Sequence, residues 1–170
     1  MPQAAALQHL IDQIRSAAHA RTPLQLRGGG SKDFLGTIQP AQRLDTRSYQ
    51  GILDYAPSEL VVTLAAGTPL QELEATLAAQ GQCLPFEPPH FTWSDTGATI
   101  GGMVASGLSG PARATVGGVR DYVLGLRMVN GLGEHLTFGG QVMKNVAGYD
   151  VSRLMVGALG TLGLITELSL

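Results

Sequence analysis

Three glycine-rich segments carry groups that could bind a ligand. The first has the sequence R-G-G-G-S-K at 27–32 and follows an apolar, strand-like run at 24–27. Consecutive glycines after a strand can present several backbone N–H groups to one anion, and Ser31 and Lys32 add a hydroxyl and a positive charge. The segment is not a G-x-G-x-x-G fingerprint, and the chain has no G-x-x-x-x-G-K-[ST] phosphate loop. An ordinary glycine loop is the alternative interpretation.

The second and third segments could bind a ligand mainly through their backbone. Residues 97–107 read G-A-T-I-G-G-M-V-A-S-G, and glycines in the first turn of a helix let a phosphate approach the N–H groups there. Close packing of that helix through small residues is the alternative. Residues 157–167 read G-A-L-G-T-L-G-L-I-T-E and join an expected helix to a strand, and taken alone they favour a tight connection.

The remaining candidates are single side chains. His9 and His19 in the first expected helix, and His135 in an expected hairpin, should be solvated, whereas His90 lies in a loop that could face a ligand. Cys83 is expected to be a small buried residue, because one thiol cannot form an internal disulfide or a multi-cysteine iron–sulfur site. The sequence contains no H-E-x-x-H, G-x-S-x-G or Cys–His metal spacing, and we assign no catalytic or metal-binding residue.

A polar group precedes the last expected helix. Lys144 and Asn145 could form a polar cluster at a pocket together with the following G-Y-D. Asp150 as the N-cap of a helix over 151–156, with Tyr149 packed against the protein, explains the same residues equally well.

Helices and strands that would position these groups are visible in the apolar pattern. Apolar residues at helical spacing predict a helix over 3–20, and a buried strand is expected at 59–66. Thr68 is expected to cap the next helix, with Pro69 at its first position, Gln71 as the reciprocal partner and Gly81 after its end.

The second half has a different character. Residues 85–98 are expected to form a long loop and 99–106 a short helix. A hairpin is predicted over 123–138 around a type I′ turn at Asn130-Gly131, and a final strand over 162–170. We therefore predict an α+β fold in one domain, 1–170, with a first lobe at about 1–90 and a second at 91–170. The abrupt end in an apolar strand suggests a fragment.

Composition limits the classes of partner. The chain has 170 residues with 11 basic and 13 acidic side chains, and no basic stripe, so nucleic acid is not an expected partner. Neither a polybasic segment nor an apolar run of membrane-spanning length is present, so no direct membrane insertion is expected. Without a recognisable signal peptide the default location is the cytoplasm, with a peripheral position at the inner face of the membrane, through partner subunits, left open.

The order of the motifs carries more information than any one of them. A glycine loop after an early strand is followed by T-I-G-G-M-V-A-S-G at 99–107, R-D-Y-V-L-G at 120–125, K-N-V-A-G-Y-D at 144–150 and G-T-L-G-L-I-T-E at 160–167. This order resembles the flavoprotein superfamily of vanillyl-alcohol oxidase and p-cresol methylhydroxylase over essentially the whole chain.

Within that superfamily the chain resembles the E subunits of bacterial glycolate oxidases. The supporting stretches are S-K-D-F-L-G at 31–36, E-L-V-V-T at 59–63, P-P-H at 88–90 and V-M-K-N-V-A-G-Y-D-V-S-R-L-M-V-G at 142–157. The D subunits and D-lactate dehydrogenases share the general pattern but differ more around 24–36 and 84–90. A UDP-sugar enolpyruvyl reductase-like flavoenzyme of the same fold fits fewer of these details.

The resemblance implies two α+β lobes with FAD between them, and its pyrophosphate on the first two glycine segments. The residues implied to contact FAD are Gly28, Gly29, Gly30, Ser31, Lys32, Thr99, Gly101, Gly102, Met103, Ser106, Ser109, Gly110, Gly163 and Ile165. Members with covalent flavin place a histidine in the first loop, so Ser31 and Lys32 imply dissociable FAD. Full members also carry a C-terminal cap domain, which we expect this chain to lack.

The implied function is an FAD-binding redox subunit that acts in a complex to oxidise a small 2-hydroxy acid such as glycolate. The implied partners are a second flavoprotein subunit and an iron–sulfur subunit. The alternative is a scaffold or assembly subunit that keeps the fold and binds flavin weakly or not at all, an alternative for which Asp33 in the first loop leaves room.

Overall fold

The computed structural model describes residues 2–36, 40–91, 97–141 and 148–170. The first half contains α1 (Pro2–Ala20), β1 (Leu24–Arg27), β2 (Gln42–Asp45), β3 (Ile52–Ala56), the 3-10 helix η1 (Pro57–Glu59), β4 (Val61–Ala65) and α2 (Leu70–Ala78). The second half contains α3 (Ile100–Ser106), α4 (Arg113–Val116), α5 (Val119–Tyr122), β5 (Gly125–Val129), β6 (His135–Gly139), α6 (Val151–Leu154) and β7 (Leu164–Ser169).

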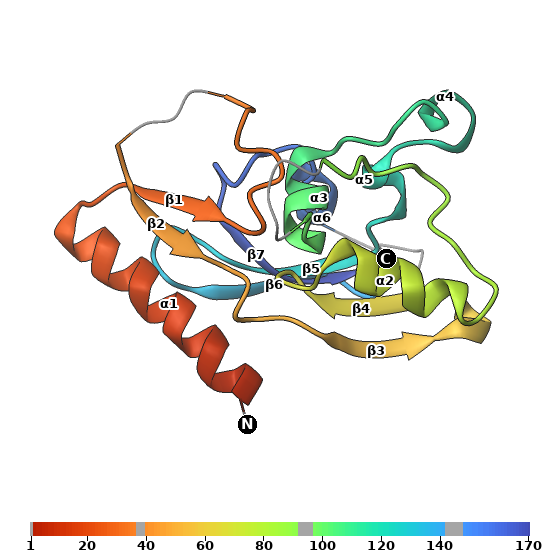
Figure 1. The fold of residues 1–170 in the computed structure, drawn as a ribbon. Helices are drawn as coiled ribbons and strands as arrows, with labels where there is room; N and C mark the ends of the chain where they lie inside the picture. Colours follow the sequence, from red (N-terminus) through yellow and green to blue (C-terminus); the bar gives the residue numbers. More distant parts are fainter. Residues whose placement is uncertain (1, 37–39, 92–96, 142–147) are drawn as a thin grey trace.

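Two sheets organise the chain (Figure 1). β1 and β2 form a small parallel sheet, and the larger sheet has the strand order β3-β4-β7-β5-β6 with antiparallel pairing throughout. Separate helices and a mainly antiparallel sheet make this an α+β fold. The larger sheet combines strands from both sides of residue 90, and the division into lobes at that point stays a prediction.

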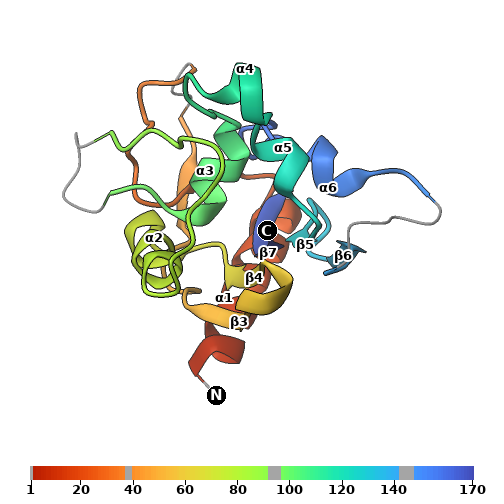
Figure 2. The ribbon, with the colours of Figure 1, turned by 90° about the vertical axis from the view of Figure 1, so that its right-hand side faces the viewer.

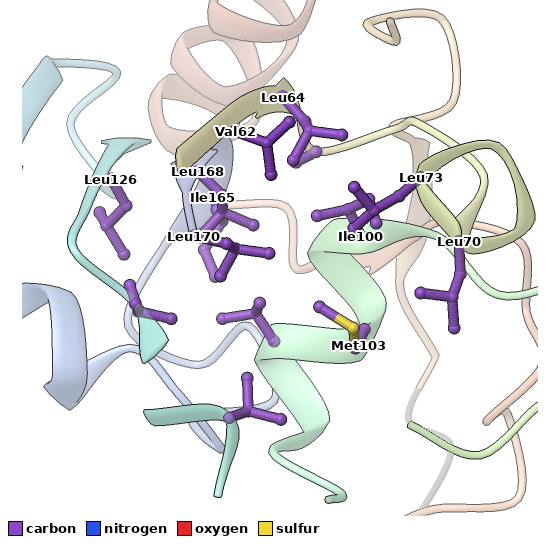
Figure 3. Packing of buried hydrophobic residues seen from close by; sticks show 14 of the residues in the cluster. Val62, Leu64, Leu70, Leu73, Ile100, Met103, Leu126, Ile165, Leu168 and Leu170 are labelled. Atoms are coloured by element: carbon purple, nitrogen blue, oxygen red, sulfur yellow. The ribbon is translucent and has the colours of Figure 1, made fainter. Parts of the chain in front are cut away.

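The larger core lies between the five-stranded sheet and the pair α2 and α3. Leu70, Leu73 and Leu77 recur at helical spacing and form the buried face of α2, while Ile100 and Met103 from α3 point into the same cluster. Figure 3 shows the labelled side chains of α2 and α3 together with apolar residues of β4 and β7, and Figure 2 shows both helices on the same side of these strands. Burial of these apolar side chains is the main force that holds the two helices on the sheet.

A smaller core fixes α1. Its buried stripe of Leu10, Ile11 and Ile14 packs with Leu44 of β2 and with Ala65 at the end of β4. Figure 1 shows α1 lying alongside the β1–β2 sheet. The apolar cluster under α1 joins this small sheet to the larger sheet. The amphipathic pattern predicted this helix almost to the residue.

Three local predictions are wrong. The side chain of Thr68 does not cap α2: its hydroxyl donates to the carbonyl of Ala65 (2.6 Å) and accepts from the N–H of Gly51 (2.8 Å), and Pro69 is the N-cap without a side-chain hydrogen bond. This buried hydroxyl therefore joins β4 to the turn before β3. Cys83 is exposed, because it lies beyond the end of α2 and outside the core.

The third error is the turn between β5 and β6. The chain between the strands spans 130–134, and the left-handed residue is Gly133 (φ 75°) instead of Gly131. The side-chain oxygen of Asn130 accepts from the N–H groups of Leu132 and Glu134, which stabilises this longer connection. A two-residue type I′ turn is therefore not formed.

Two end signals are confirmed. Asp150 accepts a hydrogen bond from the N–H of Arg153 (3.0 Å) and caps α6. Gly81 has a φ of 67°, as its place after α2 predicted. Tyr149, by contrast, is 96% exposed and is not packed, while Lys144 and Asn145 lie outside the described residues.

Candidate functional site

A cavity of about 470 Å³ lies where the first glycine loop meets the small sheet, α3 and the connection at 159–161. Eight of the predicted contact residues line it: Gly28, Gly29, Gly30, Ser31, Lys32, Thr99, Gly102 and Ser106. The fold thus brings the first two glycine segments together, although about 70 residues separate them in the sequence.

The first loop can lie against α3 because residue 28 is a glycine. A Cβ at Gly28 would lie 2.3 Å from the hydroxyl oxygen of Thr99. Thr99 is the N-cap of α3, and its hydroxyl accepts a hydrogen bond from the N–H of Gly102 (3.3 Å). The glycine therefore sets the width of the cavity at this point.

A charged pair lies on the rim of the cavity. Arg27 Nε donates to Asp33 Oδ2 at 2.7 Å, and the guanidinium lies over Gly30, where a Cβ would be 2.0 Å from Nη2. Gly30 has a φ of 76°, so both its conformation and its contact require glycine. Asp33, which could repel an anion, is thereby neutralised by a neighbour.

The loop keeps donors available to a ligand. Among the described residues, no acceptor is found for the backbone N–H groups of Gly30, Ser31 or Lys32. Lys32 Nζ lies 3.4 Å from the hydroxyl of Ser31, which is itself buried. Burial lowers the pKa of Lys32, because the ammonium group is partly removed from water. An anion in the cavity would favour the charged form of this side chain.

The other predicted contact residues lie outside the lining of this cavity, and their part in cofactor binding stays a prediction. They are Gly101, Met103, Ser109, Gly110, Gly163 and Ile165. Met103 and Ile165 are buried in the larger core. The hydroxyl of Ser109 accepts from the N–H of Val119 at 3.1 Å, which places it in the framework of α5.

Close packing explains the three glycines in that group. A Cβ at Gly101 would lie 2.9 Å from the Cβ of Ala66, at Gly110 2.5 Å from the carbonyl oxygen of Glu87, and at Gly163 2.7 Å from the carbonyl oxygen of Val129. Gly101 also donates its N–H to the carbonyl of Ala66 (2.7 Å). This packing agrees with the alternative interpretation of the second segment at position 101, while a contact of Gly101 with FAD stays a prediction.

The sequence reasoning missed the apolar part of the lining. These residues are Leu24, Leu26, Leu35, Ala41, Ala105 and Leu159. They come from β1, the first loop, the approach to β2, α3 and the last glycine segment. No local pattern distinguishes them from core residues, since their common feature is the cavity itself.

Two further candidates lie elsewhere. His90 is outside the cavity lining, and its Nε2 lies 2.9 Å from a carboxylate oxygen of Glu74 on α2. A second cavity, about 690 Å³, is lined by polar residues of α1 and β2 and shares Thr99 with the first. Its charged members Arg43 and Arg47 both pair with Asp45, and these side chains are at least 40% exposed.

Neither a metal-binding group nor a membrane-spanning helix occurs among the described residues. No group of three or more His, Cys, Asp or Glu side chains in the described ranges could hold a metal ion. Among the described helices, none combines the length and the apolar character needed to cross a membrane.

Comparison with known proteins identifies the family. A family model described as "FAD binding domain" matches residues 3–153. The chain belongs to the FAD-binding domain family. FAD is therefore the cofactor to which the lining of the cavity has to be fitted, and the donors of residues 28–32 suit the phosphates of that cofactor.

This FAD-binding domain is similar to several curated proteins. It is 54% identical to glycolate oxidase subunit GlcE of Escherichia coli (strain K12), over 96% of this chain and 46% of that protein. It is 31% identical to glycolate oxidase subunit GlcD of Bacillus subtilis (strain 168), over 98% of this chain and 36% of that protein. The chain thus spans less than half the length of these relatives.

Solved structures support the fold of the FAD-binding domain. An alkyldihydroxyacetonephosphate synthase structure matches with a TM-score of 0.74 and 27% identity, over 95% of this chain and 29% of that chain. A second structure of such a synthase matches with a TM-score of 0.71 and 24% identity. The α+β FAD-binding fold that the motif order implied is confirmed.

Proposed function

We propose that this chain holds FAD without a covalent bond, with the pyrophosphate against residues 28–32 in the first cavity. The observation that carries the proposal is the loop itself. It combines the backbone N–H groups of Gly30, Ser31 and Lys32, which have no acceptor among the described residues, with the half-buried Lys32 side chain. Thr99, Gly102 and Ser106 complete the polar side of the proposed site. The first loop contains no histidine, which supports a dissociable cofactor.

Charge supports the same placement. A pyrophosphate carries negative charge, and no carboxylate of the described residues forms an ion pair with Lys32 that would offset its desolvation. Arg27 is already paired with Asp33, so Lys32 is the cation that gains most from an anion. Charge-assisted hydrogen bonds of this kind are stronger than those between neutral groups.

We further propose that the whole protein oxidises a 2-hydroxy acid of the glycolate type. Bound FAD would accept a hydride equivalent from the carbon that bears the hydroxyl, while the hydroxyl loses its proton and a 2-oxo acid forms. Relatives named as glycolate oxidase subunits and a D-2-hydroxyglutarate dehydrogenase of Xanthomonas citri support this substrate class. The present chain holds the cofactor, and we assign none of its residues as a catalytic base.

The proposed partners follow from the same relatives. Two of them are named as different subunits of glycolate oxidase, which supports a complex with a second flavoprotein subunit. An iron–sulfur subunit, which the family resemblance implies, is the proposed carrier of electrons. The proposed location is the cytoplasm or the inner face of the membrane, through such subunits.

A scaffold subunit with weak flavin binding is the second candidate function. The observation that favours it is Asp33, whose carboxylate lines the cavity and accepts a hydrogen bond from Arg27. In that case the ion pair between Arg27 and Asp33 would take the place of a bound phosphate, and the domain would contribute to the assembly of a complex.

Titration of the purified chain with FAD separates the two functions. We expect flavin absorption bands that stay with the protein on gel filtration, and binding of ADP in the same cavity in competition with FAD. If the flavin bands separate from the protein even at high protein concentration, and circular dichroism shows that the chain is folded, the cofactor proposal is wrong. The scaffold function is then favoured.

A further inference from the structure

The first cavity has two chemically different parts. Residues 27–33, Thr99 and Gly102 form a polar part, which the proposed function assigns to phosphate. The apolar part is formed by six aliphatic side chains, of which Leu159 is the most unusual. A ligand that fills both parts needs a charged group and a flat or apolar group next to each other, which is the chemistry of a nucleotide.

Leu159 has an unfavourable backbone conformation. Its φ is 51°, in the left-handed region that leucine rarely adopts. Its neighbours Gly157 and Gly160 are also left-handed, with φ values of 80° and 77°, but they are glycines and adopt this conformation freely. Leu159 is thus a left-handed position of this turn at which a large side chain is present.

Two hydrogen bonds hold this turn against the end of α3. The N–H of Leu159 donates to the carbonyl of Ala105 (2.8 Å), and the N–H of Gly157 donates to the carbonyl of Val104 (3.0 Å). A leucine normally serves to fill a core, yet 56% of the surface of Leu159 is exposed at the cavity. The fold therefore maintains a strained backbone for a side chain that contributes little to its own packing.

We propose that Leu159 is a cofactor-binding residue whose side chain packs against a heteroaromatic ring of bound FAD. This inference rests on the proposed function and adds a residue that determines affinity. Strain at such a position persists when a functional contact requires it. Covering the exposed half of one leucine with a ring corresponds to about a fivefold gain in affinity.

Leu60 provides a matched control within the same chain. It is also a left-handed leucine, with φ 56°, and it is 74% exposed at the end of η1. It does not line the cavity. Replacing either leucine with glycine relieves the same backbone strain, but only the change at 159 removes a proposed ligand contact.

The test measures thermal stability and FAD affinity of Leu159→Gly, Leu60→Gly and Leu159→Met. We expect both glycine variants to unfold at an equal or higher temperature than the unchanged chain. We expect about fivefold weaker FAD binding for Leu159→Gly alone, and retention by Leu159→Met, which keeps a long apolar side chain. Parallel titrations with ADP and with FMN identify the ring, because the compound that carries it shows the same loss.

The outcomes separate this inference from the proposed function. Equal FAD affinity of Leu159→Gly and the unchanged chain overturns the role of Leu159 while leaving FAD binding intact. An equal loss in Leu60→Gly also overturns it, because the effect would then come from the backbone in general. An unchanged chain that binds no FAD overturns both proposals.

Discussion

Lys32 is the charged residue on which the proposed cofactor site depends most. Its pKa is lowered from an ordinary value of 10.5 because burial disfavours the ammonium form. The folded chain without ligand therefore binds the proton of Lys32 less tightly than the unfolded chain does. Stability linked to this group rises with pH between the lowered pKa and 10.5, whereas affinity for an anion falls over the same range.

We predict that Lys32→Met weakens FAD binding by about tenfold or more, because a charged hydrogen bond to the pyrophosphate is lost. In the unchanged chain, FAD affinity should decline as pH rises through the lowered pKa of Lys32. Isothermal titration between neutral pH and pH 10 measures both effects.

Arg120→Met is the control for Lys32→Met. Arg120 is exposed on α5 and does not line the cavity, so its removal changes the net charge equally without touching the site. Equal losses in the two variants would mean that overall charge, instead of a local contact, determines the affinity.

Single residues also show where sequence reasoning stops. A ligand-binding role for Gly28 to Lys32 could be predicted because a run of glycines beside a cation can bind an anion, although an ordinary glycine loop explained the same residues. Gly101 and Gly110 carry the same letters but are glycines because Ala66 and Glu87 lie against them. A glycine that faces a ligand and one that faces a neighbouring strand are distinguished only by the tertiary structure.

At the scale of elements, the corner between β4 and α2 lies where it was predicted, but the predicted capping contact does not form there. The strand and the helix were predicted, yet Thr68 bonds to the turn before β3 instead of capping the helix. The local sequence places a hydroxyl near the start of a helix. In the fold, however, this hydroxyl accepts a hydrogen bond from the N–H of Gly51, 17 positions away. The turn after β5 fails for a related reason, because the side chain of Asn130 organises a longer connection.

We predict that Thr68→Val destabilises the chain by about 1–3 kcal/mol, because the partly buried N–H of Gly51 is left without its acceptor. Thr68→Ser keeps the hydroxyl and should retain most of the stability. Urea denaturation followed by circular dichroism gives the free energy of unfolding for each variant. If the serine variant loses as much as the valine variant, the methyl group and not the hydrogen bond stabilises this corner.

At the scale of the whole molecule, neither the pairing of the strands nor the cavity could be read from local patterns. β1, β4, β5, β6 and β7 were expected from their own residues, whereas β2 and β3 were not. The order β3-β4-β7-β5-β6 depends in addition on contacts between segments about 100 residues apart. The order of the motifs supplied what the patterns could not, because a whole family shares that arrangement. The apolar lining that includes Leu159 was still missed.

We predict that amide hydrogen exchange is slowest in β7 and the adjoining β5. β7 is paired on both sides, with β4 and β5, whereas β1 and β2 form a separate two-stranded sheet. Interior strands open only in large unfolding events, while small sheets open locally. Exchange measured by mass spectrometry checks this order, and equal protection of β1 and β7 would contradict it.

The place of β7 has a consequence for how the chain folds as it is synthesised. The pairs β3–β4 and β5–β6 are each close in sequence and can form early, but β7 is the strand that lies between them. Until the ribosome has released residues 164–169, the inner edges of both hairpins have no partner. Such edges can pair with other chains, so the strand order leaves both hairpins open to that pairing until β7 has been synthesised.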